Sequence, residues 1–433
     1  MEKNRRRKIL GVESSYKVLV VSLLLYFIGS QLYTFFPVSP NVIIGILVVF
    51  SILLVFAFEG DYYRILMVCA CALMILLSIV RSDNLGGNLS EGIRVISLIF
   101  MFVLITKKYA CLEMLKAFDS LSRIIKLLVF LFTVLTYVEL ILPSCYTIGN
   151  VKGGWGDNAY FVGFTTSQHM AASNALLLLA LVFVYFHKKN FSYLDFAFLM
   201  APALAVLQSG ARVYLIPLAA GFVLYYFFRL KGQRLSILIV PILLVGLVYL
   251  FLHTGMFAKF VAVSTGVNLE NQGLAYSLTN SRTWMWENLI SSFGEATLFD
   301  QVFGQGFNLS EDSIGKTAHN DLLFMLVSSG VLGLLVYCIA VLRALCSLWK
   351  HHLKDSQYGK IVWVSLALYV AAPILLNGLY NNPHLVFAVV VMFSVSAGLA
   401  RECRITSIEN DIGTFATTSK QHRYLKGGGK AFR

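Results

Sequence analysis

The chain has 433 residues, of which 58% are hydrophobic and only 13% are charged, and its mean hydropathy is +0.74. About a quarter of the residues of a soluble globular protein are charged, so this composition excludes a soluble enzyme, a disordered chain and a collagen-like fibre. A polytopic integral membrane protein remains. The net charge of +13 is therefore interpreted first in terms of the membrane.

Twelve apolar segments approach the roughly 20 residues that a helix needs to cross a bilayer core. They lie at 17–36, 41–58, 62–80, 92–106, 124–142, 169–187, 193–209, 211–228, 235–252, 318–343, 360–378 and 384–400. The expected fold is an all-α polytopic membrane protein, with a single transmembrane domain over 1–400. A basic, flexible tail is expected over 401–433.

The basic residues orient these segments. The starting sequence MEKNRRRK places the N-terminus in the cytoplasm, because segments rich in Lys and Arg stay on that side. Twelve crossings then put 28 of the 35 Lys and Arg residues in cytoplasmic segments, with both termini on the cytoplasmic side. Anionic membrane lipid is the expected partner of this charge, and nucleic acid is not.

Two predicted outer loops are long, at 143–168 and 253–317, and long loops usually carry function. The second contains TNSRTWMWENLISSF (279–293), which predicts an interfacial helix that begins after a cap at Thr279, Asn280 or Ser281. One face of that helix would carry Trp286, Leu289, Ile290 and Phe293. Arg282 in its first turn opposes the helix dipole unless an anion lies nearby, although a contact with lipid phosphate would explain it too.

Arg212 and His319 are the other candidate residues at the outer boundary. Arg212 follows the tight turn 209–211, and its guanidinium matches phosphate oxygens, although a snorkelling arginine is the alternative. His319 and Asn320 are expected in the first turn of the tenth segment, with Thr317 as cap. His319 could act there as a general base or a hydrogen-bond donor, or be structural.

The remaining outer residues give weaker indications. Trp155 suits stacking on a sugar ring as well as an interfacial belt. His169, His253 and His384 lack the spacing of metal ligands, so no metal site is predicted. Glu139 is interpreted as a solvated boundary acid rather than a proton-coupling group. Two arginines and a histidine on the outer side suit an anionic, phosphate-bearing substrate.

These residues resemble the O-antigen polymerase and O-antigen ligase superfamily (Wzy-type surface polysaccharide polymerases). His319-Asn320, nine residues and Gly330-x-x-Gly333 are similar to that family's His-containing motif. Arg212 with Ile216 resembles the Arg-x-x-x-Leu of the ligases except at its last position. Arg282 with Trp286, and GFTTSQHMAASNALLLL at 163–179, are the other similarities.

The resemblance implies a GT-C-like glycosyltransferase in the bacterial cytoplasmic membrane. It would transfer a glycan from undecaprenyl diphosphate to a sugar hydroxyl, as in O-antigen or capsule synthesis, with no metal, no nucleotide sugar and no other cofactor. His319, Arg212 and Arg282 would be catalytic, and the predicted substrate-binding residues are Asn320, His169, Trp286 and Trp155.

The resemblance further implies a chain-length regulator and a flippase as partners. A polymerase is the leading hypothesis. A ligase that uses a different acceptor and a lipid-linked oligosaccharide flippase are the alternatives.

Overall fold

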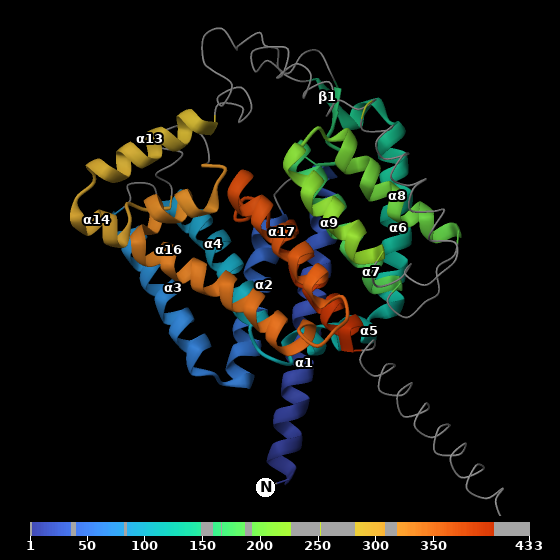
Figure 1. The fold of residues 1–433 in the computed structure, drawn as a ribbon, viewed down its shortest axis with the longest axis horizontal. Helices are drawn as coiled ribbons and strands as arrows, with labels where there is room; N and C mark the ends of the chain where they lie inside the picture. Colours follow the sequence, from blue (N-terminus) through green and yellow to red (C-terminus); the bar gives the residue numbers. More distant parts are fainter. Residues whose placement is uncertain are drawn as a thin grey trace, which may run out of the picture.

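The computed structural model describes residues 2–35, 40–81, 85–148, 159–165, 167–186, 193–226, 252, 282–307 and 318–401. These residues are almost entirely helical (Figure 1). Among them, eight helices are long and apolar enough to cross a membrane, and three more are apolar but shorter. The chain is therefore a multi-pass membrane protein of the all-α class.

The helices follow the predicted segments. The first part of the chain forms α1 (Glu2–Gln31), α2 (Pro40–Glu59), α3 (Tyr62–Arg81), α4 (Leu85–Ile105), α5 (Ala110–Ser120) and α6 (Ser122–Ile141). The second part forms α7 (Gln168–Phe186), α8 (Tyr193–Gln208), α9 (Leu215–Tyr225), α13 (Arg282–Glu295), α14 (Leu298–Phe303), α16 (Asp321–Leu348), α17 (Gly359–Leu376) and a last apolar helix, Pro383–Arg401. The predicted ninth segment, 235–252, lies outside the described residues except for Leu252.

Two stretches differ from the expected boundaries. The fourth helix begins at Leu85, seven positions earlier than predicted, because Asn88 is buried and its side-chain oxygen accepts from Ser78 Oγ of α3 (2.7 Å). The stretch 107–123, which separates two predicted segments, contains the amphipathic helix α5. That helix buries Cys111, Met114 and other apolar side chains, and it packs on α1.

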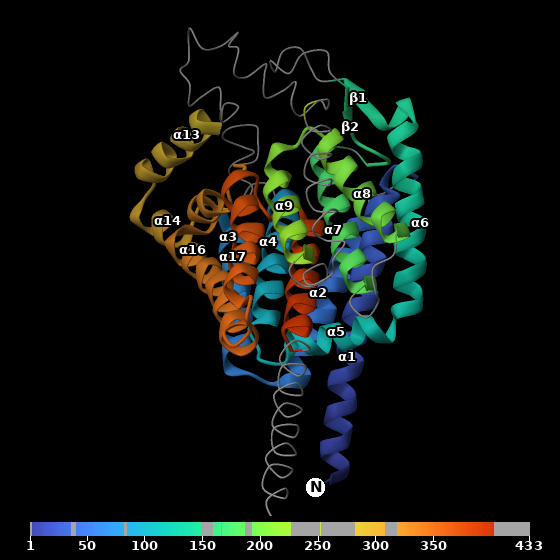
Figure 2. The ribbon, with the colours of Figure 1, turned by 45° about the vertical axis from the view of Figure 1, so that its right-hand side comes forward.

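The two ends of the bundle are distinct in Figures 1 and 2. The start of α1 and the helix α5 lie at one end, which we call the N-terminal end. At the opposite end, which we call the loop end, lie α13 and a small antiparallel hairpin of β1 (Tyr146–Ile148) and β2 (Ala159–Phe161). The described parts of the two long predicted loops therefore share one end of the molecule.

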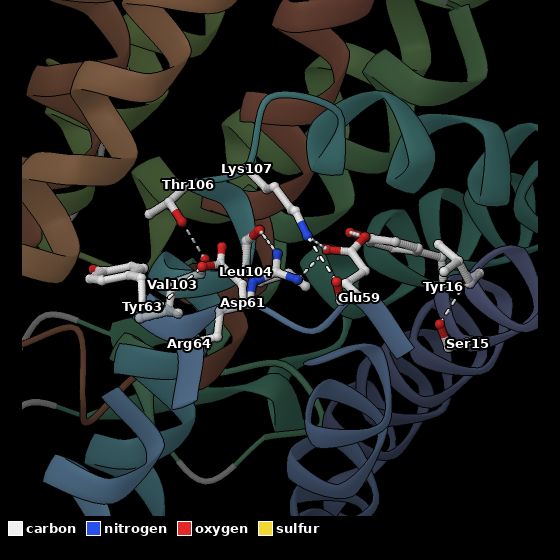
Figure 3. Close-up of polar contacts among 11 residues, drawn as sticks. Ser15, Tyr16, Glu59, Asp61, Tyr63, Arg64, Val103, Leu104, Thr106 and Lys107 are labelled. Atoms are coloured by element: carbon white, nitrogen blue, oxygen red, sulfur yellow. Dashed lines mark hydrogen bonds and ion pairs between the residues drawn. The ribbon is translucent and has the colours of Figure 1, made fainter. Parts of the chain in front are cut away.

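A buried polar network fixes the N-terminal end (Figure 3). Glu59 accepts from the Tyr16 hydroxyl (2.8 Å) and forms ion pairs with Arg64 and with Lys107 (3.2 Å). Arg64 is 1% exposed and also donates to the carbonyl of Leu104 (2.9 Å). A buried charge is tolerated only when it is paired and hydrogen-bonded, so these contacts hold α1, α2, α3 and the end of α4 in one arrangement.

Candidate functional site

A tight turn between α8 and α9 places Arg212 at the loop end. Gly210 has φ +68°, and a Cβ there would come within 2.4 Å of the Tyr160 ring, so only glycine fits. The backbone N–H of Ala211 donates to Ser209 Oγ (3.2 Å). Arg212 then opens a short 3₁₀ turn that leads into α9. The hairpin of the first long loop is thus packed against the turn that carries Arg212.

The last turn of α17 anchors two of the predicted site residues. The Arg282 guanidinium donates to the carbonyl of Leu376, and Asn320 Nδ2 donates to the carbonyl of Leu375 (3.2 Å). The final carbonyls of a helix lack intrahelical partners and carry the negative end of its dipole. The positive charge of Arg282 is unfavourable at the N-terminus of its own helix, α13. It is stabilised here because it contacts the C-terminus of α17, where the helix dipole is negative.

Arg212 and Arg282 lie close enough to repel each other. Burial, and then the positive charge of Arg212, lowers the pKa of Arg282 to about 10, against a smaller opposite effect of Tyr214. Arg282 therefore still carries its charge at neutral pH. No ion pair between the described residues includes either arginine. A bound anion would relieve this repulsion, and phosphate oxygens match the donor geometry of guanidinium groups.

His319 occupies a left-handed backbone conformation, with φ +51°. Such a conformation is uncommon outside glycine, costs about 1–3 kcal/mol, and clusters at functional sites. The Asn320 side chain accepts from the backbone N–H of Leu323 (3.1 Å), so Asn320 is the N-cap and α16 begins at Asp321. The expectation that His319 and Asn320 lie in the first turn is corrected accordingly. Thr317, the predicted cap, lies outside the described residues.

Four side chains from four separate parts of the chain, His169, Tyr214, His319 and Asn377, converge beside the arginines. The ring of His169, at the start of α7, lies 6.4 Å from the ring of His319 and 6.0 Å from that of Tyr214. The Tyr214 hydroxyl accepts from Asn377 Nδ2 (3.0 Å), and Asn377 directly follows α17. Tyr214 also interacts electrostatically with Arg282. Tyr214 and Asn377 were not predicted, since neither residue type stands out in an apolar sequence.

A cavity of about 680 Å³ opens next to this cluster. His169, His319 and Asn377 contribute to its lining. Its other walls are largely apolar and come from α1, α2, α4 and the start of the last helix. Exposed Arg94, which pairs with Glu91 (2.6 Å), and buried His384 also line it. The cavity therefore joins the polar cluster to an apolar space among the helices.

Glu139 is buried, with 3% of its surface exposed, so its interpretation as a solvated boundary acid is wrong. One carboxylate oxygen accepts from the backbone N–H of Phe164 (3.0 Å). Gly163 packs so closely that a Cβ would lie 3.2 Å from the other oxygen. The hydrogen bond from Phe164 replaces the lost hydration in part. Glu139 holds the segment that leads to His169.

α16 is broken at Gly330, where φ is +67° and ψ is −172°. The break releases two carbonyls, and Val327 and Ser328 accept from the backbone N–H groups of Gln305 (3.1 Å) and Gly306 (3.0 Å). A Cβ on Gly330 would lie 2.3 Å from the carbonyl oxygen of Val302. Gly330 therefore packs closely against the end of α14.

The helix predicted to follow 279–281 is confirmed as α13, while the candidate caps Thr279, Asn280 and Ser281 lie outside the described residues. Three anchors tie α13 and α14 to the bundle. Trp286 Nε1 donates to the carbonyl of Ala318 (3.1 Å), Arg282 bonds α17, and Arg81 of α3 pairs with Asp300. Met285 and Leu289 are the buried residues of α13, whereas Ile290, on the predicted apolar face, is 54% exposed.

The structure therefore brings together Arg212, Arg282, His169, His319, Asn320 and Trp286. Asn320 and Trp286 use their polar atoms within the protein, as anchors of the site. Trp155 lies outside the described residues. No group of three His, Cys, Asp or Glu residues that could hold a metal is found in the described parts of the chain.

Fold and site define a class: a multi-pass helical membrane protein with a pair of arginines and a pair of histidines at one end of its bundle. Comparisons with models of known protein families and with curated protein sequences find no match for this chain.

Proposed function

We propose that the protein is a membrane glycosyltransferase that polymerises undecaprenyl-diphosphate-linked repeat units of a surface polysaccharide. It would have twelve spans in a GT-C-like arrangement and act at the outer face of the bacterial cytoplasmic membrane, with both termini in the cytoplasm. The single observation that carries the proposal is that Arg212 and Arg282 lie near each other, and that Tyr214, which interacts with Arg282, connects them to His169 and His319.

The two arginines would hold the donor's diphosphate. A guanidinium offers five donors in a fixed fork, and Arg282 uses one of its nitrogens to bond Leu376. The other donors, with those of Arg212, remain for phosphate oxygens. Such donors stabilise the charge that develops on a departing diphosphate, and removing one donor of this kind typically costs about 100- to 1,000-fold in rate.

His319 and His169 would act on the acceptor sugar. The acceptor oxygen forms a bond to the anomeric carbon of the donor, and the bond from that carbon to the diphosphate oxygen breaks. Undecaprenyl diphosphate leaves with the electron pair, and the hydroxyl proton passes to His319 or to the phosphate. An imidazole is suited to this transfer near neutral pH.

The cavity next to the histidines would take the second substrate. Its apolar walls suit a polyprenyl chain. Arg94, whose Nη1 pairs with Glu91, would offer its remaining guanidinium donors to a second diphosphate. An acceptor with its own lipid diphosphate distinguishes a polymerase from a ligase, whose acceptor differs. The position of the arginines and histidines at one end of the bundle, rather than at its midplane, favours an enzyme over a flippase.

The decisive experiment is turnover of a lipid-linked repeat unit by the purified protein, with the chain length of the product measured. We expect a ladder of lengthened lipid-linked glycan that also forms in the presence of a chelator. Consumption of donor only with a separate acceptor would indicate a ligase. Movement of lipid across proteoliposomes without any glycan transfer would indicate a flippase.

A further inference from the structure

The N-terminal end of the bundle carries a second cavity, of about 250 Å³, whose lining shares no residue with the larger one. It is lined by Lys108, Tyr109, Leu112, His351, His352 and Arg401. These residues come from the link between α4 and α5, from the first turn of α5, from a π-helical turn at Trp349–Leu353 and from the end of the last helix. Four of the six can carry positive charge.

The contrast between two neighbouring lysines shows how this cavity is charged. Lys107 points to Glu59 and is neutralised by it (3.2 Å; Figure 3). Lys108 instead lies over the ring of Tyr109, with its ammonium 5.2 Å from the ring centre. Lys108, Lys350 and Lys354 all act electrostatically on His351. No Asp or Glu is among the described residues that line the cavity, so every ionisable side chain of the lining except the Tyr109 hydroxyl is basic.

Three aromatic side chains lie in or beside the elements that line the cavity: Tyr109, Trp349 and Trp363. Tyr109 is 59% exposed, and Trp349 packs edge-on against Trp363 (6.1 Å). Trp and Tyr are enriched where the membrane core meets the headgroups. The π-helical turn adds a second indication, because π-helical turns occur frequently at functional sites. This turn places His351 and His352 together at the cavity.

We propose that this cavity binds the phosphate headgroup of an anionic phospholipid from the leaflet at the N-terminal end. Basic pockets between membrane helices recognise such headgroups by charge. In the turns of α16 that precede the cavity, Ile339 and Leu342 are exposed, which provides an apolar surface for the acyl chains. The chain after Arg401 has six Lys or Arg against three Asp or Glu. Its net positive charge would be repelled by the basic cavity, so this segment is disfavoured as the group that fills it.

The test is binding of full-length protein, in neutral detergent, to mixed micelles of phosphatidylglycerol or phosphatidylcholine. We expect binding that needs phosphatidylglycerol and weakens about 30-fold in the double variant Lys108→Gln/Arg401→Gln, since each basic residue near an anionic surface contributes roughly fivefold. The charge-matched control is Lys116→Gln/Lys360→Gln. Lys116 pairs with Glu113, and neither control lysine lines the cavity. This control should bind within about twofold of the parent.

Equal binding of phosphatidylcholine, or equal losses in the two double variants, would overturn the proposal. Inorganic phosphate is tested as competitor in the same assay. Its failure to displace the lipid supports a headgroup site that needs the acyl chains. Displacement at phosphate concentrations equal to those of the lipid would assign the cavity to free phosphate instead.

Discussion

The rings of His169 and His319 lie 6.4 Å apart, although one residue lies in the first turn of α7 and the other immediately precedes the N-cap of α16. Each is held by contacts outside its own helix. Glu139 fixes the segment before His169, and Trp286 bonds the carbonyl of Ala318, next to His319. A pair positioned in this way can receive a hydroxyl group between two imidazoles without large rearrangement.

Replacement of either arginine should abolish polymer formation while the protein still inserts and folds. We expect Arg212→Ala and Arg282→Ala each to lower turnover by about 100-fold or more, because each removes donors to the leaving diphosphate. Arg282→Lys should recover little, since an ammonium lacks the fork geometry. Turnover and thermal unfolding are measured together.

Trp284→Ala is the matched control for the arginine variants, because Trp284 is 50% exposed on the same helix, α13. It should retain near-parental turnover. Normal activity in both alanine variants of the arginines would contradict the diphosphate clamp.

The buried hydrogen bond between Tyr214 and Asn377 should contribute measurably to the free energy of unfolding. Tyr214→Phe leaves the buried amide of Asn377 without its acceptor, at a cost of about 1–3 kcal/mol in unfolding free energy. Because Asn377 is part of the cavity lining, turnover should fall as well. Asn377→Leu combined with Tyr214→Phe should cost less than the two single losses added together, since both polar groups are then gone. Strict additivity in denaturation measurements would show that the two side chains are not coupled.

Gly330→Ala should disrupt the loop end of α16. The new Cβ would lie 2.3 Å from the carbonyl oxygen of Val302, at a φ of +67° that alanine rarely adopts. We expect a loss of roughly 3 kcal/mol or more in unfolding free energy, together with loss of turnover. The control is Gly294→Ala in α13, where nothing lies within 4 Å of the added methyl group and the helical backbone favours alanine. A mild Gly330→Ala phenotype would contradict the close contact with α14.

A topology reporter tests the orientation predicted from the basic residues. Fusions at Gly266 or Asn308, both in the second long loop, should report the outer side, because the excess of Lys and Arg remains in the cytoplasm. A cytoplasmic signal from either fusion would reverse the assignment of both ends of the bundle. It would also move the arginine pair to the wrong side for a lipid-linked donor at the outer face.

The apolar segments could be predicted because the bilayer length and the hydropathy of each helix are local properties. The candidate residues Arg212, Arg282 and His319 stood out for a related reason. Placing a charged or titratable side chain in a membrane segment costs free energy, so the few that occur near span ends are candidates for a functional role. Their convergence in space could be expected only from the resemblance.

The contacts that position these residues could not be predicted. Leu376 binds Arg282 through its backbone carbonyl, a group that every residue has and that the sequence therefore cannot single out. Tyr214 and Asn377 are of residue types that commonly occur at span boundaries. The prediction for Glu139 failed because a carboxylate near a span end is usually solvated, whereas here the backbone of 163–164 covers it. The break at Gly330 was hidden as well, since glycine in a membrane helix is common.

The two hydrogen bonds that link 305–306 to 327–328 set a register between the segment after α14 and the broken helix α16. An insertion of one residue between Gly304 and Gly306 would shift that register and leave one carbonyl at the break without its hydrogen bond. An insertion in 308–317 would leave both bonds in place. Relatives of this protein that differ in loop length should therefore gain or lose residues in 308–317, while the stretch from Gly304 to Gly306 keeps its length.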